Sequence, residues 1–142
     1  MPQRVRRSFV EPGTAFEVEQ LVTRYIHLVD DSDWESLRDV FIDDAVCDYS
    51  AFGLPVIRGL DSIIRTFSSM THPLSHHAVN TLIESGEDDS TLYVRSKLLL
   101  VMAPGKIWAG EYRDRVVLTP DGWLFAERTA VQPSRRQSSG SA

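Results

Sequence analysis

An aspartate at the predicted end of the first helix is the first side chain suited to proton transfer. Asp30 ends that helix and lies four residues before Trp34. A carboxylate there faces the negative end of the helix dipole, which costs roughly 0.3–1 kcal/mol. Asp31 shares this disadvantage, whereas Asp33 would lie favourably in the first turn of the next helix. Asp30 or Asp31 is therefore a candidate functional acid, and an acid-rich turn between helices is the structural alternative.

Two adjacent histidines lie in a predicted strand, where neighbouring side chains point to opposite faces. One of His76 and His77 should face the interior, where an imidazole near a carboxylate forms an acid–base pair that titrates near neutrality. A purely structural histidine is the alternative. The strict alternation puts His76 on one face with Ala78, Asn80 and Leu82, and His77 on the other with Val79, Thr81 and Ile83. His27 and His72 are expected on the surface or in turns.

Aromatic residues form a third group. Tyr25 precedes Asp30 by a little over one helical turn, Tyr49 lies in an early strand, and Trp108 shares a strand face with Tyr112. If that face is concave, the rings line a pocket and their polar tips orient a ligand. Packing in the core is the alternative.

Several kinds of site are excluded. The histidines spaced i, i+4, His72 and His76, do not lie in one predicted helix as a helical zinc site requires, and Cys47 is the single cysteine, so neither a metal site nor an internal disulfide is expected. Phosphate loops, nucleotide fingerprints and the serine-hydrolase elbow are missing from the sequence, so no cofactor is expected. A net charge of −5 argues against nucleic-acid binding. No apolar run approaches the ~20 residues that span a membrane, and a cytoplasmic location is expected.

The elements that must position these side chains fall into two halves. With 142 residues, of which 42% are hydrophobic, the chain predicts one domain at 14–132, between an arm at 1–13 and a disordered tail at 133–142. Apolar residues at three- and four-residue steps predict a helix after Thr14, where Glu17 completes a capping box. A second capping box, Ser32 with Glu35, predicts another helix through Phe41. A third helix is expected at 61–70.

The second half has the pattern of strands. Segments near 75–85, 91–103, 106–118 and 123–132 are separated by short turns and predict an antiparallel meander, and a shorter pair is expected at 46–50 and 56–58. Helices followed by a sheet indicate an α+β domain with a cavity on the concave side. The outer face would carry Val79, Ile83, Leu99 and Val101, which predicts a homodimer or homotrimer through that face.

Five stretches together resemble the SnoaL-like group of the nuclear transport factor 2-like superfamily, which includes scytalone dehydratase, bile-acid dehydratase and polyketide cyclases. The stretches are 25–34 (YIHLVDDSDW), 41–46 (FIDDAV), 76–80 (HHAVN), 110–114 (GEYRD) and 121–128 (DGWLFAER). The resemblance covers about 14–132. It implies a cone-shaped barrel, a strongly curved mixed or antiparallel sheet closed by three N-terminal helices.

The resemblance also implies an aspartate–histidine pair, which matches Asp30 and His76, with His77 one position away. Two family tyrosines match Tyr25 and Tyr49. The full set of predicted substrate contacts is Tyr25, Trp34, Tyr49, Asn80, Trp108 and Tyr112, of which Trp108 and Tyr112 follow from their shared strand face. The chain departs from scytalone dehydratase, which has a second pocket histidine on a later strand, because no histidine follows His77.

These features predict a cofactor-independent lyase or isomerase, dehydratase-like, that acts on a hydrophobic ring compound by acid–base catalysis. Two alternatives remain. One is a non-catalytic ligand-binding or assembly module, such as the small subunit of a ring-hydroxylating dioxygenase. The other is an epoxide hydrolase, which would need a water held by an Asp–Arg–Asp group.

Overall fold

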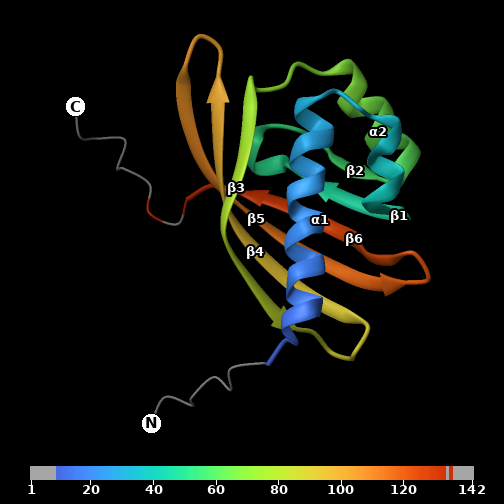
Figure 1. Cartoon of the computed structure of the whole chain (residues 1–142). Helices are drawn as coiled ribbons and strands as arrows, with labels where there is room; N and C mark the ends of the chain where they lie inside the picture. Colours follow the sequence, from blue (N-terminus) through green and yellow to red (C-terminus); the bar gives the residue numbers. More distant parts are fainter. Residues whose placement is uncertain (1–8, 134, 136–142) are drawn as a thin grey trace.

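The computed structural model describes residues 9–133 and 135. Within this part of the chain two α-helices and six strands form one α+β unit (Figure 1). In chain order the elements are α1 (Pro12–Asp30), the 3-10 helix η1 (Glu35–Asp39), β1 (Phe41–Asp48), the 3-10 helix η2 (Ser50–Phe52), β2 (Val56–Arg58), α2 (Leu60–Ser69), β3 (Ser75–Ser85), β4 (Thr91–Met102), β5 (Lys106–Thr119) and β6 (Gly122–Val131).

The strands form a single mixed sheet in the order β2-β1-β6-β5-β4-β3. The predicted meander is confirmed, because β3 to β6 pair antiparallel with their sequence neighbours. The one parallel pair joins β1 to β6. Figure 1 shows α1 crossing one face of the curled sheet, with α2 beside β1 and β2. The sheet is open at β2 and β3, so the expectation of a barrel closed by three helices is corrected to a curled sheet with two α-helices.

The core lies between α1, α2 and the inner face of the sheet. The buried side of α1 carries Val18, Leu21, Val22, Tyr25 and Val29, which recur at helical spacing. On the short α2, Leu60, Ile63, Ile64 and Phe67 are buried in the same way. Each large apolar side chain buried here stabilises the fold by about 1.5–3 kcal/mol, and this packing fixes α1 against the sheet.

Both predicted capping boxes are wrong. Pro12 lies in the first turn of α1, where its fixed φ suits the helix, so the helix begins before Thr14. Ser32 has a φ of 57°, and its amide donates to the carbonyl of Val29 while that of Asp33 donates to Leu28. This is the Schellman arrangement that closes a helix, so Ser32 ends α1 instead of beginning the next helix. The predicted second helix is only η1.

A bulge interrupts β3. Asn80 has a φ of 55°, and the register with β4 shifts between Val79 and Leu82. One extra residue reverses the side-chain alternation, so Thr81 and Ile83 face inward and Leu82 is exposed. The predicted alternation therefore holds only before the bulge.

The ends of the predicted domain are only partly described. Pro12 and Gly13, assigned to the arm from sequence, belong to α1. Residues 1–8, 134 and 136–142 lie outside the described residues, and with them most of the predicted arm and tail.

Candidate active site

The Asp30 and His76 side chains meet where the end of α1 lies against the start of β3. Nδ1 of His76 lies 2.7 Å from Oδ1 of Asp30, and the backbone amide of His76 donates to both carboxylate oxygens at 3.1 and 3.2 Å. These donors offset the unfavourable position of a carboxylate at a helix C-terminus. The pair is therefore held at two points, through the ring and through the backbone.

The Asp30 carboxylate fixes the tautomer of His76. Because a carboxylate only accepts hydrogen bonds, Nδ1 carries the proton and Nε2 carries the lone pair. Burial lowers the pKa of His76, although the hydrogen bond and charge of Asp30 oppose this shift. No described residue forms a hydrogen bond with Nε2, and this atom is not fully buried, so a ligand can reach it. His76 is thus a neutral imidazole whose Nε2 is free to act as a base.

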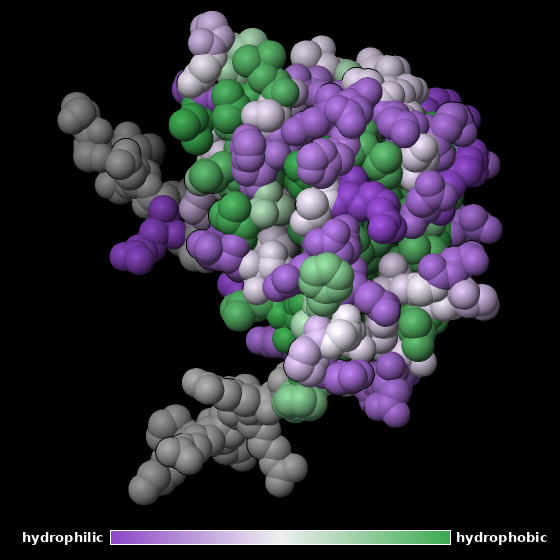
Figure 2. Space-filling model, viewed as in Figure 1, coloured by the Kyte–Doolittle hydropathy of each residue, from purple (hydrophilic) through white to green (hydrophobic). Residues whose placement is uncertain are grey.

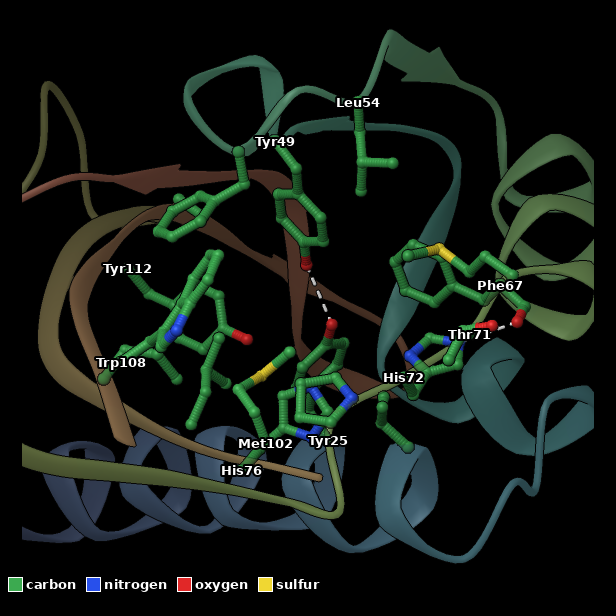
Figure 3. Close-up of a pocket in the computed structure, with 17 residues that line it drawn as sticks. Tyr25, Tyr49, Leu54, Phe67, Thr71, His72, His76, Met102, Trp108 and Tyr112 are labelled. Atoms are coloured by element: carbon green, nitrogen blue, oxygen red, sulfur yellow. Dashed lines mark hydrogen bonds between the residues drawn. The ribbon is translucent and has the colours of Figure 1, made fainter. Parts of the chain in front are cut away.

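His76 lines a cavity of about 260 Å³ between the helices and the inner face of the sheet (Figure 3). The wall is mostly aromatic and aliphatic, and among the described residues no Lys, Arg, Asp or Glu lines it. It is formed by Tyr25, Val29, Tyr49, Phe52, Leu54, Phe67, Met70, Thr71, His72, Pro73, His76, Leu98, Leu100, Met102, Trp108, Tyr112 and Ala130. Such a cavity suits an uncharged apolar ligand with few polar groups.

The hydroxyl groups of Tyr25 and Tyr49 face each other across the cavity wall at 2.8 Å (Figure 3). Burial raises the pKa of Tyr25 to about 12 and that of Tyr49 well above its ordinary value. Both groups therefore keep their protons at neutral pH. When one hydroxyl donates to the other, the second proton is available for a ligand oxygen.

A buried ion pair lies beneath this tyrosine pair and was missed from the sequence. Arg128 on β6 donates to both carboxylate oxygens of Asp114 on β5, at 2.8 and 2.9 Å. Its guanidinium carbon lies 4.2 Å from the ring centre of Tyr25 and 3.9 Å from that of Tyr112. These cation–π contacts hold the two rings in place. The sequence feature that could have indicated this ion pair is the presence of two opposite charges at inward positions of neighbouring strands.

The structure brings together most of the residues predicted for the site. Tyr25, Tyr49, His76, Trp108 and Tyr112 line the cavity. Asp30 lies behind His76 and does not line the cavity itself. The open choice between the two histidines is resolved, since His77 is exposed and bonds the hydroxyl of Ser75.

Two predicted substrate contacts lie elsewhere. Trp34 stacks on the ring of His72 and does not line the cavity. Asn80 is exposed at the bulge of β3, four residues beyond His76, because the bulge turns its side chain outward. His72, expected in a surface turn, does line the cavity. The local sequence around His72 contains no feature that distinguishes a cavity residue from a residue in a surface turn.

No group of three or more His, Cys, Asp or Glu side chains suited to a metal ion occurs among the described residues. Neither α-helix in the described ranges is long and apolar enough to cross a membrane. The search of curated proteins found no match.

Solved structures similar to this one include three proteins from Novosphingobium aromaticivorans. The first, provisionally assigned as an aromatic ring hydroxylase, has a TM-score of 0.77 and 26% identity over 89% of this chain and 94% of its own. The second, provisionally assigned as a scytalone dehydratase, has a TM-score of 0.71 and 22% identity over 89% and 99%. The third, described as nuclear transport factor 2-like with a cystatin-like fold, has a TM-score of 0.72 and 19% identity over 87% and 84%.

These likenesses confirm the predicted α+β architecture. A family model described as the SnoaL-like domain matches residues 15–129, which includes Asp30, His76 and both tyrosines of the hydroxyl pair. The chain belongs to the SnoaL-like family.

Proposed function

We propose that this protein is a lyase or isomerase, dehydratase-like, that acts on a neutral hydrophobic ring ketone by acid–base catalysis. The observation that carries the proposal is the unpartnered Nε2 of His76 in the wall of an apolar cavity, with Nδ1 held 2.7 Å from Asp30. The base, the group that orients it and the hydrogen-bond donors are all side chains. The reaction as proposed requires no cofactor.

The proton balance of the reaction closes on His76 alone. Nε2 takes a proton from the carbon next to the substrate carbonyl, and the electron pair of the broken C–H bond forms an enolate. Asp30 stabilises the resulting imidazolium, and the hydroxyl of Tyr25 or Tyr49 donates to the enolate oxygen. The imidazolium then returns its proton to another carbon of the conjugated system, which is isomerisation, or to a β-hydroxyl that leaves as water, which is dehydration.

The cavity restricts the substrate by charge and by size. Without a charged side chain in its described wall, it offers no partner for a phosphate or carboxylate group, and burying an unpaired charge there is costly. A volume of about 260 Å³ lies just below the ~300–1,000 Å³ typical of sites for drug-sized ligands. A compact ring compound fits this site better than a long-chain or highly charged metabolite.

Family membership supports the proposal at a coarser level, because a structural neighbour is provisionally assigned as a scytalone dehydratase. The epoxide-hydrolase alternative has less support. Asp114 is the only described carboxylate that bonds Arg128, and neither residue lines the cavity where a water would have to attack.

The test is turnover of a panel of small cyclic β-hydroxy ketones and β,γ-unsaturated ketones, followed by absorbance of the conjugated product. His76→Ala and Asp30→Asn should each lower kcat on the order of 10²–10⁴-fold without lowering the melting temperature. His77→Ala is the matched control, because His77 is exposed and lies next to the base. Full activity in either site variant would refute the assignment.

A second candidate function is supported by the neighbour assigned as an aromatic ring hydroxylase. In that case the domain would be a non-catalytic module that binds an oxygenase subunit, and the polar pair would only stabilise the fold. The two functions differ in one measurement. A module should bind its partner equally well as wild type and as His76→Ala, and neither form should turn over any ketone in the panel.

We also propose that a second copy of the chain covers the outer face of the sheet, as a homodimer or through a related contact in a trimer. Val79, Leu99 and Val101 face outward there, and on β5 Ile107 is 66% exposed. Ile83, predicted on this face, lies inside because of the β3 bulge. In Figure 2, where α1 lies toward the viewer, hydrophobic residues are also visible near the end of the β4–β5 hairpin.

A further inference from the structure

His72, in the loop between α2 and β3, has a fixed tautomer. Its Nε2 lies 2.7 Å from the backbone carbonyl oxygen of Phe67. Because a carbonyl oxygen only accepts, Nε2 carries the proton, and Nδ1 of the neutral ring carries the lone pair. This is the reverse of His76, in which Asp30 places the proton on Nδ1.

The ring of His72 is held rigidly. It stacks on Trp34 with ring centres 4.7 Å apart and planes inclined by 27°, and the ring of Phe67 contacts it edge-on at 5.9 Å. Together with the hydrogen bond to Phe67, these contacts fix the position of the ring. A rigid acceptor loses little conformational entropy when it binds a ligand.

The free nitrogen of His72 belongs to the same cavity as the proposed base. His72 lines the cavity, and Figure 3 shows its ring directed toward the interior on the side opposite Trp108. The His72 and His76 rings lie 6.3 Å apart, centre to centre. No described residue bonds Nδ1 of His72, and this atom is not among the fully buried unpartnered atoms. The polar groups of the cavity wall therefore include two acceptor nitrogens and the Tyr25–Tyr49 hydroxyl pair.

We infer that His72 is a specificity-determining residue whose Nδ1 accepts a hydrogen bond from a hydroxyl group of the substrate. This inference rests on the proposed function and narrows its substrate class to ring ketones that carry a hydroxyl. The carbonyl binds at the Tyr25–Tyr49 pair, which donates, and the hydroxyl binds at His72, which accepts. The remaining wall contacts the rings through apolar side chains such as Trp108 and Leu100.

An acceptor that becomes buried when the ligand binds favours ligands that can donate a hydrogen bond to it. When a ligand without the hydroxyl occupies the site, Nδ1 loses water and gains no partner, so the analogue binds more weakly. One neutral hydrogen bond of this kind corresponds to a preference of roughly tenfold. Replacing the imidazole with an apolar ring of similar shape should remove the preference and leave the stacking on Trp34.

The experiment compares binding of 1-tetralone with its 5-, 6- and 7-hydroxy derivatives by isothermal titration calorimetry. Wild type should bind at least one hydroxylated isomer about tenfold more tightly than 1-tetralone. His72→Phe should bind that isomer and 1-tetralone with equal affinity, and the control His77→Phe should keep the wild-type preference. The inference would be overturned if His72→Phe kept the preference for the hydroxylated isomer. It would also be overturned if wild type showed no such preference or bound none of the ligands.

A second measurement avoids any folding defect of the variant. In wild type, ¹⁵N–¹H correlation spectra of the histidine side chains should show an unprotonated Nδ1 on His72. The preferred hydroxylated ligand should move that resonance upfield, and 1-tetralone should leave it in place. An unchanged Nδ1 resonance with the hydroxylated ligand bound would overturn the inference.

Failure of this inference and failure of the proposed function are distinguishable. If only the role of His72 is wrong, turnover of the ketones depends on His76, and a hydroxyl group on the ketone does not change its affinity. If only the catalytic proposal is wrong, hydroxylated ligands are preferred in a manner that depends on His72, and His76→Ala changes no reaction rate.

Discussion

The guanidinium of Arg128 and the carboxylate of Asp114 form a two-point ion pair in which neither side chain is accessible to solvent. Nη1 of Arg128 has no hydrogen-bond partner among the described residues. The charge is balanced by Asp114 and by the faces of the Tyr25, Tyr112 and Phe125 rings. The pair is thus a support for Tyr25, one of the two proposed hydrogen-bond donors of the site.

Removing one member of this pair should be far more harmful than removing both. Asp114→Ala leaves the Arg128 charge buried without a partner, which we expect to lower the free energy of unfolding by about 3–5 kcal/mol. Asp114→Leu combined with Arg128→Met removes both charges and should cost clearly less. Urea unfolding of the three proteins measures these differences. Equal losses in the single and double variants would contradict the view that the unpaired charge dominates.

The hydroxyl pair of Tyr25 and Tyr49 should behave as a coupled unit. Either single change to Phe removes one hydroxyl and deprives the other of its 2.8 Å partner. The double change removes both. We expect a coupling free energy of about 1 kcal/mol in a double-mutant cycle followed by chemical unfolding. Strictly additive losses would show that the two hydroxyls do not stabilise each other.

The lowered pKa of His76 predicts how stability depends on pH. Burial is the main cause, so folding favours the neutral imidazole. Between the folded pKa and the unfolded value of about 6.5, the unfolded chain binds more protons, and the free energy of unfolding rises with pH. This stability is fully present above about pH 6.5 and is lost as pH falls through the folded pKa.

Two measurements should report that same pKa. Urea unfolding of wild type between pH 5 and 8 should show a slope that His76→Gln reduces and His77→Gln retains. If His76 is the base, the acid limb of kcat/KM for any ketone substrate should fall at the same pH. An acid limb far from the pKa that NMR gives for His76 would assign the base to another group.

The spacing of apolar residues was enough to predict most helices and strands, because this spacing repeats along each element. The helical spacing of Leu21 and Tyr25 identified α1, and β3 to β6 match the predicted strands within a few residues. The Asp30–His76 contact came from resemblance, since 46 residues separate the partners and spacing alone does not join them.

The features that the sequence did not reveal depend on single residues in unusual environments. The sequence pattern predicts that Ser32 begins a helix. In the structure the amides of Ser32 and Asp33 donate to the carbonyl oxygens of Val29 and Leu28 and so end α1. His72 reads as a turn residue, and its place in the cavity depends on stacking with Trp34, 38 residues earlier in the sequence. Such contacts are fixed by tertiary packing and leave no periodic signal.

The outer face of the sheet predicts the effect of a new charge on assembly. Leu99→Arg introduces a charge into the apolar patch, where Leu99 is 41% exposed, and should convert the proposed oligomer to monomer. Phe16→Arg is the matched control, because Phe16 is also exposed but lies on α1. Light scattering at micromolar concentration measures the mass of each protein. A monomeric wild type would contradict the proposal.

The bulge at Asn80 decides which side chains of β3 reach the core. Its φ of 55° suits glycine and asparagine but not a β-branched residue. Asn80→Gly should therefore change the free energy of unfolding by less than about 1 kcal/mol, whereas Asn80→Val should lower it by about 1–2 kcal/mol. If valine instead removes the bulge, Leu82 turns inward and Ile83 outward, and the hydroxyl contact of Thr81 with Ser96 is lost. Thermal unfolding of both variants measures the difference, and equal stability would show that the local backbone conformation is not the constraint.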